Sequence, residues 1–366
     1  MKLTNLPKLK NILIVPLDWG LGHATRSIPL ITNLMANNCL VLIAGEESVK
    51  CLLQAEFPGV QILPLKGYRI QYSRQKAWLP LKIVSQIPRI LLSVYREHQW
   101  LKKVVKQYEI DAVIADNRFG LYHSRIPCIY ITHQLLIKTG NSVTEKILRK
   151  CHQWFIKKYT QCWVPDFEGS DNIAGVLSHP GNLLSNIKYI GCLSRFEKNY
   201  HGPCIYDVMI LVSGPEPQRT IFEKQLLVQL KEFTGTVLFI RGLPQQVKAF
   251  VPKELKANIE VKNHLEAASL SLAIQQSAII ICRSGYTTIM DLIKLQKKAI
   301  LVPTPGQTEQ EYLGEYLMQK KIFFCVQQQD FVLFNALGQA NEFCYTNKEY
   351  GMEAFKNTIS HLVKNQ

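Results

Sequence analysis

The turn after the first apolar run holds a histidine that is placed to accept a proton. Residues 11–16 (NILIVP) predict a buried strand, and Gly20, Gly22 and His23 follow it, just before a helix expected over 24–37. The glycines let the backbone turn tightly and approach a ligand, and the helix start exposes free N–H groups. We expect the glycines to contact an acceptor and the neutral imidazole to take its proton. The alternative is a histidine that only caps the helix.

Two later strands also end in polar side chains. The predicted strand 112–115 (AVIA) is followed by Asp116, and the strand 129–132 (IYIT) is followed by His133 and Gln134. The carboxyl ends of parallel strands meet at one sheet edge, so the carboxylate can orient the imidazole of the first turn. The other pair suits contacts to the hydroxyls or phosphate of an acceptor. A turn carboxylate and a loop histidine bonded to backbone are the alternatives.

The second half carries a denser group of polar residues at two turns. A strand over 278–281 leads into a tight turn and a helix that carries a carboxylate inward, and a strand over 299–302 leads into a second polar loop. A carboxylate in a cleft can accept both hydroxyls of a ribose. Helix N-terminal amides, with hydroxyl and amide side chains, can hold phosphate or sugar oxygens without a metal. The residues expected there are Arg283, Ser284, Gly285, Thr287, Asp291 and Gln310.

The elements that must position these residues alternate between strand and helix. The first half repeats this alternation, and the pattern restarts at the strand 207–212, which ends in Ser213 and Gly214. The sequence thus predicts an α/β protein with two Rossmann-like, doubly wound domains facing across a cleft. The expected parts are an acceptor-binding domain over 1–195, a nucleotide-sugar-binding domain over 204–346 and a C-terminal helix over 347–366, with a linker over 191–203.

Composition and spacing exclude several classes of protein. The chain has 366 residues, of which 47% are hydrophobic and 19% charged, as in folded two-domain proteins. None of its 10 cysteines forms a CxxC pair, so neither a zinc site nor a disulfide framework is expected. Thr25 replaces the third glycine of a dinucleotide fingerprint, and no acidic residue ends the second strand, which disfavours NAD. We expect no metal and no cofactor.

The turns of the second half resemble a known family. The segments RSGYTTIMD and VPTPGQTEQEYLGEY, within 278–316, resemble the C-terminal signature of family-28 glycosyltransferases, which have the GT-B fold and use nucleotide-sugar donors. The type member adds N-acetylglucosamine to a lipid-linked peptidoglycan precursor. The resemblance implies that Asp291, where most members carry Glu, holds the donor ribose and that Gln310 contacts the donor. It implies no metal.

Weaker resemblances extend over most of the chain. The segment GLGH, ending at His23, resembles the family's glycine-rich loop, and the segment at His133 resembles its acceptor loop. The segment GCLSR stands where the family has Gly-x-Pro-x-Arg, which implies that Arg195 touches the donor. Ser213-Gly214 occupies the place of the family's phosphate turn. The pairing of His23 with Asp116 is similar to the catalytic pair of plant-type glycosyltransferases of the same fold.

Positive charge is concentrated in the first half. Residues 1–200 hold 26 Lys and Arg against 13 Asp and Glu, and residues 66–106 hold ten basic residues against the single acid Glu97. Leucine, isoleucine and tryptophan interleave with them, which suits contact with an anionic membrane surface. The alternative is a solvated helix face. No nucleic-acid-binding fold signature appears, so nucleic acid is not an expected partner.

The expected activity is that of a hexosyltransferase, which moves a hexosyl group from a nucleoside-diphosphate sugar, UDP-linked by resemblance, to a hydroxyl acceptor with inversion. A lipid-linked acceptor would lie at a membrane, which the basic face could contact. The alternatives are a nucleotide-sugar 2-epimerase of the same fold and a non-catalytic sugar-nucleotide-binding subunit. The N-terminal apolar run is too short for a signal peptide, so we expect a cytoplasmic protein, peripheral on the inner membrane face.

Overall fold

The chain divides into two compact units. The first comprises Met1–Asn172, Val176–Leu193 and Met352–Gln366, and the second comprises Ile173–Gly175 and Ser194–Gly351. The computed structural model describes residues 10–18, 21–68, 79–244, 246, 255–346 and 348–364, without the side chains of 21, 48, 79–85 and 87. Gly20, Arg69, Arg74, Lys76 and the side chain of Lys82 therefore lie outside the described residues.

The first unit is built on a seven-stranded parallel sheet in the order β3-β2-β1-β4-β5-β6-β7. The strand order reverses between β1 and β4, which is the topological switch point of a doubly wound sheet. The strands are β1 (Asn11–Val15), β2 (Leu40–Gly45), β3 (Gln61–Pro64), β4 (Ala112–Asp116), β5 (Cys128–Ile131), β6 (Gln161–Val164) and β7 (Ile187–Tyr189).

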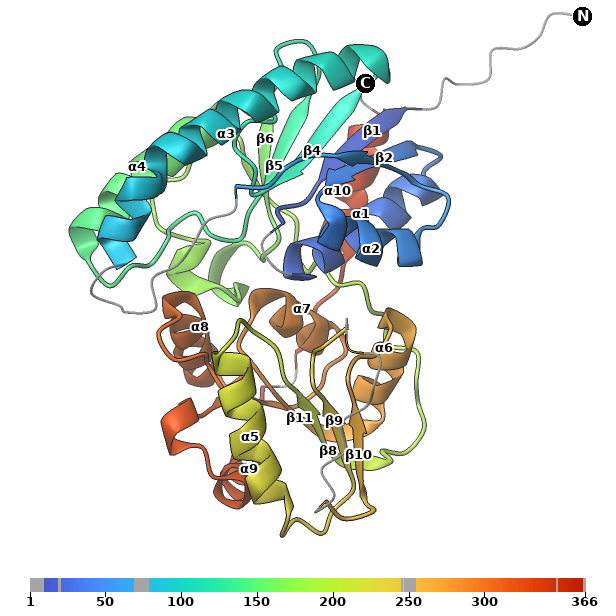
Figure 1. Ribbon diagram of the computed structural model, residues 1–366, viewed down its shortest axis with the longest axis vertical. Helices are drawn as coiled ribbons and strands as arrows, with labels where there is room; N and C mark the ends of the chain where they lie inside the picture. Colours follow the sequence, from blue (N-terminus) through green and yellow to red (C-terminus); the bar gives the residue numbers. More distant parts are fainter. Residues whose placement is uncertain are drawn as a thin grey trace, which may run out of the picture. The chain divides into compact units, whose positions relative to one another are not determined.

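Helices cover both faces of this sheet (Figure 1). One face is covered by α3 (Leu79–Gln107) and α4 (Ser142–Ile156), whose residues share a core with Leu13 and Val15 of β1. On the other side, α1 (Leu21–Ala36) contacts α2 (Glu47–Glu56) and α10 (Glu353–Lys364), although α10 follows the second unit in sequence. The central strands are buried on both faces, as parallel strands between two helix layers are. Two short 3-10 turns span Gly169–Asp171 and Gly175–Leu177.

The second unit has a six-stranded parallel sheet in the order β10-β9-β8-β11-β12-β13, with its switch point between β8 and β11. Its core includes Phe222, Phe239, Ile281 and Phe331, all nearly inaccessible to solvent. Its elements are β8 (Tyr206–Leu211), α5 (Gln218–Leu230), β9 (Val237–Ile240), β10 (Ile259–Lys262), α6 (Ala267–Gln275), β11 (Ser277–Cys282), α7 (Tyr286–Lys294), β12 (Ala299–Leu301), α8 (Thr308–Gln319), β13 (Phe324–Cys325), a 3-10 turn (Gln328–Asp330) and α9 (Leu333–Glu342).

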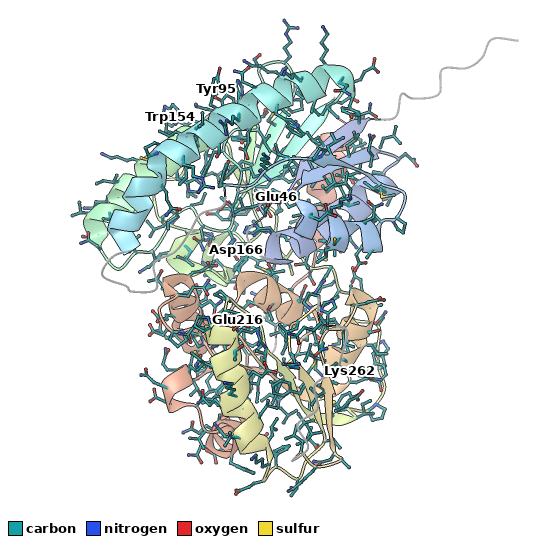
Figure 2. All side chains as sticks on the ribbon, in the orientation of Figure 1. Glu46, Tyr95, Trp154, Asp166, Glu216 and Lys262 are labelled. Carbon is teal, nitrogen blue, oxygen red and sulfur yellow. The ribbon has the colours of Figure 1, made fainter. Side chains whose placement is uncertain are left out.

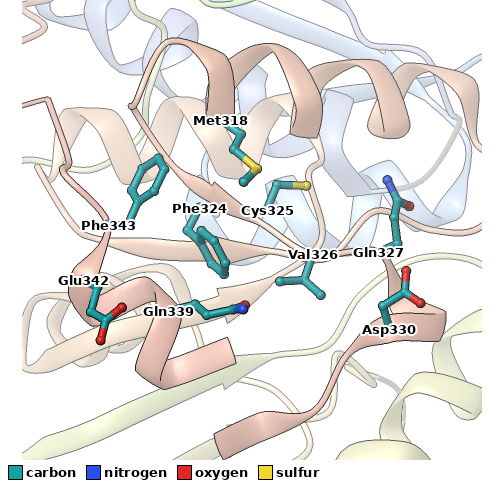
Figure 3. A pocket seen from close by; sticks show the side chains of 9 residues that line it. All are labelled: Met318, Phe324, Cys325, Val326, Gln327, Asp330, Gln339, Glu342 and Phe343. Atoms are coloured by element: carbon teal, nitrogen blue, oxygen red, sulfur yellow. The ribbon is translucent and has the colours of Figure 1, made fainter. Parts of the chain in front are cut away.

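A hollow on the second unit lies beside its edge strand β13 and has a volume of about 550 Å³ (Figure 3). It is shallow, and none of the predicted donor residues lines it. No helix in the described part of the chain is both long and apolar enough to cross a bilayer. The lining residues are Met318, Phe324, Cys325, Val326, Gln327, Asp330, Gln339, Glu342 and Phe343.

Candidate active site

His23 and Asp116 meet at the switch point of the first sheet. His23 lies in the first turn of α1, directly after β1, and Asp116 is the last residue of the neighbouring strand β4. The Nδ1 atom of His23 is 3.0 Å from Oδ2 of Asp116. The carboxylate is buried, whereas the imidazole retains 16% of its exposure. A carboxylate that holds one ring nitrogen while the ring stays accessible is the geometry of an oriented general base.

Arg26, which was not predicted from the sequence, completes this cluster. Its Nε atom donates to Oδ2 of Asp116 at 3.0 Å, and its Nη2 atom also bonds Oδ1 of the same carboxylate. The same Nη2 atom is 2.8 Å from Nδ1 of His23. The sequence signal that could have indicated Arg26 was its spacing, because a residue three positions after His23 lies on the same helix face.

The protonation of the His23 ring depends on which of these bonds forms. If Nδ1–H donates to Asp116, then Nε2 keeps its lone pair and can accept a proton. If Arg26 donates to Nδ1, the proton of the neutral ring sits on Nε2. The Nη2 group of Arg26 carries two N–H bonds, and its contact with Asp116 uses only one of them, so these contacts allow both arrangements.

Asp116 is held as a carboxylate by its cationic neighbours. Burial raises the pKa of its carboxyl, but Arg26 and then His23 lower it by more, and the balance sets it at about 2, below the ordinary 3.8. Asp116 is therefore charged at neutral pH and can stabilise an imidazolium on His23.

His133 joins the cluster through the same arginine. The Nη1 atom of Arg26 is 3.0 Å from Nδ1 of His133, which follows β5. Gln134 lies beside it, with its amide nitrogen 3.5 Å from Nε2 of His133. The carbonyl of Gly22 accepts a bond from the Thr25 hydroxyl at 3.0 Å. The structure thus brings together three of the predicted side chains, His23, Asp116 and His133, around one unpredicted guanidinium.

A second buried charge network holds the loops at this sheet edge. Arg118, with 0% of its surface exposed, donates to Glu97 of α3 at 2.8 Å and to Asp18 after β1 at 2.9 Å. Tyr68, after β3, donates to Glu97 at 2.7 Å, and Asp18 accepts from the backbone of Glu46, after β2, at 2.9 Å. Burial raises the pKa of both Glu97 and Asp18 despite the opposing charge of Arg118. One guanidinium therefore ties the turn that leads to His23 to α3 and to the loops after β2, β3 and β4.

In the second unit, Asp291 of α7 is paired with the residues after the first unit's last strand. Ser194 donates to its Oδ1 atom at 2.6 Å, and Nε of Arg195 lies 3.8 Å from its Oδ2 atom. Asp291 is only 5% exposed, and burial raises the pKa of its carboxyl although Arg195 opposes this. Arg195 and Asp291 are thus brought together as predicted donor residues.

The β11–α7 turn and the β12–α8 loop are joined by buried polar contacts. Ser284 donates to the carbonyl of Gln310 at 2.8 Å, and the side-chain oxygen of Gln310 accepts from the backbone of Thr304 at 2.9 Å. The hydroxyl of Thr304 is buried and has no hydrogen-bond partner among the described residues. A side chain added at Gly214, whose φ is +105°, would meet this hydroxyl at 3.6 Å. The turn after β8 and the β12–α8 loop therefore lie side by side, and Thr304 is a polar group that sequence reasoning missed.

Arg283 lies beneath these loops. Its Nη1 atom donates to the carbonyls of Val302 and Pro303 at 3.1 and 3.2 Å, and its Nη2 atom bonds Gln328 at 2.8 Å. The guanidinium packs 4.2 Å from the Phe222 ring, and burial lowers its pKa to about 10. These bonds hold the loops of this edge together and leave only Nε without a partner among the described residues.

The remaining predicted donor residues lie at the same edge of the second sheet. Ser213 and Gly214 directly follow β8, Gly285 is the N-cap of α7, and Thr287 is in its first turn. His264, which was not predicted, follows β10. Burial lowers the pKa of its imidazole, and the positive charge of Arg195 lowers it further. In the described part of the chain, no group of three or more His, Cys, Asp or Glu side chains is placed to hold a metal ion.

Most of the second half of the chain matches a known protein family. Residues 219–365 match the glycosyltransferase family 28 C-terminal domain. This span includes the two signature turns and α10. Comparison with curated proteins by sequence finds no significant match.

Solved structures share the fold of the whole chain at low identity. A kitacinnamycin glycotransferase has a TM-score of 0.65 at 15% identity, over 98% of this chain and 95% of that one. MurG of Acinetobacter baumannii has a TM-score of 0.56 at 15% identity, over 98% and 100%. The spinosyn rhamnosyltransferase SpnG, solved with thymidine diphosphate, has a TM-score of 0.57 at 12% identity, over 96% and 95%. The chain has the GT-B fold of these glycosyltransferases, and its residues 219–365 match the glycosyltransferase family 28 C-terminal domain.

Proposed function

We propose that the protein transfers a hexosyl group from a nucleoside-diphosphate sugar to a hydroxyl acceptor, with inversion at the anomeric carbon. The observation that carries this proposal is the match of residues 219–365 to the family 28 C-terminal domain. The polar turns within that match supply groups of the kinds that ribose, diphosphate and sugar require.

The second unit binds the donor in this proposal. Asp291 and Arg195 meet the ribose, and the amide nitrogen of Gln310, which makes no hydrogen bond to the described residues, is free to donate to the sugar. The helix N-terminus at Gly285 and the turn at Gly214 offer N–H groups to the diphosphate. These groups stabilise the negative charge that develops on the leaving diphosphate.

The first unit supplies the base. Asp116 accepts the Nδ1–H of His23, so Nε2 can take the proton of the acceptor hydroxyl as its oxygen attacks the anomeric carbon. The bond from that carbon to the diphosphate oxygen breaks, and the nucleoside diphosphate leaves with the electron pair. His133 and Gln134 lie next to this base and contact the acceptor.

The resemblance to family 28 favours a uridine diphosphate donor. Structures of similar fold have also been solved with thymidine diphosphate, as in the complexes of SpnG and of VinC. Both ligands share the pyrimidine, the diphosphate and at least one sugar hydroxyl. We therefore expect UDP-sugars to be the preferred donors and dTDP-sugars to be the second choice.

We also propose that the acceptor is lipid-linked and that the first unit contacts an anionic membrane. Large apolar side chains are exposed on α3 at Leu91, Leu92 and Tyr95, and on α4 at Val143, Ile147 and Trp154 (Figure 2 labels Tyr95 and Trp154). On α4 they alternate with exposed lysines along one stripe, and Nζ of Lys158 lies 3.5 Å from the centre of the Trp154 ring. Apolar groups mixed with cations suit the interface of an anionic bilayer. The exposed stripe along α4 and its C-cap consists of Val143, Lys146, Ile147, Lys150, Trp154 and Lys157.

Substitution of the proposed base tests the transfer mechanism. We expect His23→Ala to lower the rate of sugar transfer by about 10²–10⁴-fold, because no group then accepts the hydroxyl proton. Binding of UDP, measured by calorimetry, should stay unchanged. The assay follows a labelled sugar from a panel of UDP- and dTDP-hexoses into polyprenyl-linked acceptors, and His201→Ala, at an exposed histidine, is the control. A His23→Ala protein with the full transfer rate would reject the base assignment.

A further inference from the structure

A cavity of about 180 Å³ lies within the first unit, between its sheet and the C-terminal helix α10. Strands β5, β6 and β7 form one side of it. Their register pairs Ile129 with Gln161 and Trp163 with Lys188, and Gln161 and Trp163 are two positions apart on β6. Because side chains alternate between the two faces of a sheet, all four of these lie on one face, which is the face that α10 covers here.

Helix α10 forms the other side of the cavity. Thr358 and Leu362 line it, and they share one helix face because they are four positions apart. Pro127 and Thr160, which directly precede β5 and β6, also line it, so the cavity lies at the amino ends of these strands. The proposed base and Asp116 lie at the carboxyl ends of β1 and β4. The cavity is therefore separate from the proposed catalytic site.

Two polar groups at this cavity lack a partner, and both are hydrogen-bond donors. The indole N–H of Trp163 can only donate, and it bonds Oε1 of Gln161 at 2.8 Å, so the amide Nε2 of Gln161 points away from the indole. Neither this Nε2 atom nor Nζ of Lys188 bonds another described residue. None of the described residues that line the cavity is acidic. Free donors and a positive charge without a counter-charge favour an anionic ligand.

The depth of the cavity is apolar and its mouth is polar. Ile129 and Trp163 are each 1% exposed, whereas Thr160 and Gln161 are exposed and Lys188 is half-buried. A ligand with an apolar body inside and an anionic head at the mouth matches this polarity. An apolar cavity of roughly 150 Å³ is large enough to hold benzene, so this cavity has room for a body of about six carbons.

We propose that this cavity binds a small monocarboxylate with an apolar body, and that Lys188 and the amide of Gln161 hold its carboxylate. The ammonium of Lys188 supplies a charge-assisted bond and the amide a second donor. Because α10 forms one wall, the bound ligand stabilises the packing of this helix on the sheet of the first unit. The inference does not depend on the proposed sugar transfer.

Three matched probes test the site on the full chain by calorimetry: benzoate, benzamide and acetate. We expect benzoate to bind saturably at one site. Benzamide, which has the same ring without the charge, and acetate, which has the charge without the ring, should each bind at least about tenfold more weakly. Equal binding of benzamide contradicts the anion site, and equal binding of acetate contradicts the apolar body. If benzoate shows no saturable binding, the whole inference is overturned.

Substitution of the lysine tests where the ligand binds. Lys188→Met keeps an apolar side chain of similar length, so benzoate should bind at least about tenfold more weakly and benzamide within about threefold of the unmodified protein. Lys224→Met, at an exposed lysine of α5, should leave both affinities unchanged. Benzoate affinity that is unchanged in Lys188→Met, or lost in His23→Ala, overturns the assignment. If Lys188→Met does not fold, Leu362→Phe decides, because the larger side chain enters the cavity from α10 and should exclude benzoate.

Discussion

At the scale of single residues, Arg26 is the group that connects the polar side chains of the first unit. Its guanidinium contacts the Asp116 carboxylate and lies within 3.0 Å of ring nitrogens of both His23 and His133. Because it neutralises Asp116, it limits how strongly this carboxylate polarises the base. It also fixes the carboxylate in the orientation that His23 needs.

The low pKa of Asp116 predicts a dependence of stability on pH. The folded carboxyl has a pKa of about 2 against an ordinary 3.8, so its contribution to stability is complete above about pH 5 and is lost as the pH falls toward 2. The difference corresponds to about 2 kcal/mol. Asp116→Asn lacks this titration, so urea unfolding should show a gap to the unmodified protein that narrows between pH 5 and pH 2.

The exposed Glu56, on α2, provides the control for that measurement. Glu56→Gln should stay close to the unmodified protein at each pH. A gap between Asp116→Asn and the unmodified protein that stays constant down to pH 2 would show that Asp116 is not held as a carboxylate by Arg26 and His23.

Several site residues could be predicted because they stand at the carboxyl ends of parallel strands. His23, Asp116 and His133 each follow or end such a strand, and the doubly wound topology brings those ends together. Arg26 was missed because a charged residue in the second turn of a helix usually faces water, whereas this side chain is buried and contacts Asp116 of β4 and His133 after β5. The contact between Ser194 and Asp291 spans 97 positions in sequence, so no local pattern indicates it.

At the scale of elements, Arg118 connects the loops that carry the first unit's site. It bonds a carboxylate after β1 and another on α3, and its Nη2 atom donates to the carbonyl of Lys66 at 2.6 Å. Two buried carboxylates depend on this one cation. A buried pair of this kind is costly to break, because the remaining partners stay desolvated and unpaired.

Removal of this guanidinium should destabilise the first unit. We expect Arg118→Met to lower the free energy of unfolding by about 3–5 kcal/mol, because Glu97 and Asp18 then lack their cation. Urea unfolding at pH 7, followed by tryptophan fluorescence, measures it. Arg125→Met, at an exposed arginine a few residues later, should change the stability by less than about 0.5 kcal/mol. Equal losses in the two variants would contradict the role of Arg118.

The sequence predicted the strands that are apolar runs, including the short β5 and β12, and missed several other short strands. Strands β1, β4, β8 and β11 are continuous apolar runs, and their observed bounds differ from the predicted ranges by one residue or so. Strand β10 alternates polar and apolar residues over four positions, and β13 has only two residues, so neither gives a periodic signal. The packing of α10 against α1 could not be predicted either, because the long second unit separates them in sequence.

At the scale of the whole molecule, the first unit combines most of the excess positive charge with exposed apolar side chains. The excess of basic residues over residues 1–200 accompanies the exposed apolar side chains of α3 and α4. The part of the basic stretch around Arg69, Arg74 and Lys76 lies outside the described residues. The stripe on α4 extends the predicted membrane-contacting segment to a helix that the sequence analysis did not include.

Vesicle binding tests the proposed membrane surface. We expect the full chain to sediment with vesicles that contain about 30% phosphatidylglycerol more strongly than with neutral vesicles, and less strongly as salt rises. The double variant Ile147→Ser, Trp154→Ser should lose at least tenfold in affinity, because two apolar side chains no longer enter the interface. The control Val228→Ser, Phe334→Ser removes equally exposed apolar groups from the second unit. Equal binding by the two double variants would contradict the assignment.

The central claim is that the second unit of this glycosyltransferase holds a nucleoside diphosphate. Thermal unfolding of the full chain with 1 mM UDP, UDP-hexoses, dTDP, ADP or GDP tests it most directly, because a ligand that binds only the folded state raises the midpoint. We predict that UDP and its sugars raise the midpoint by several degrees, that dTDP raises it by less or equally, and that ADP and GDP leave it unchanged. If no pyrimidine nucleoside diphosphate raises the midpoint, the account is contradicted.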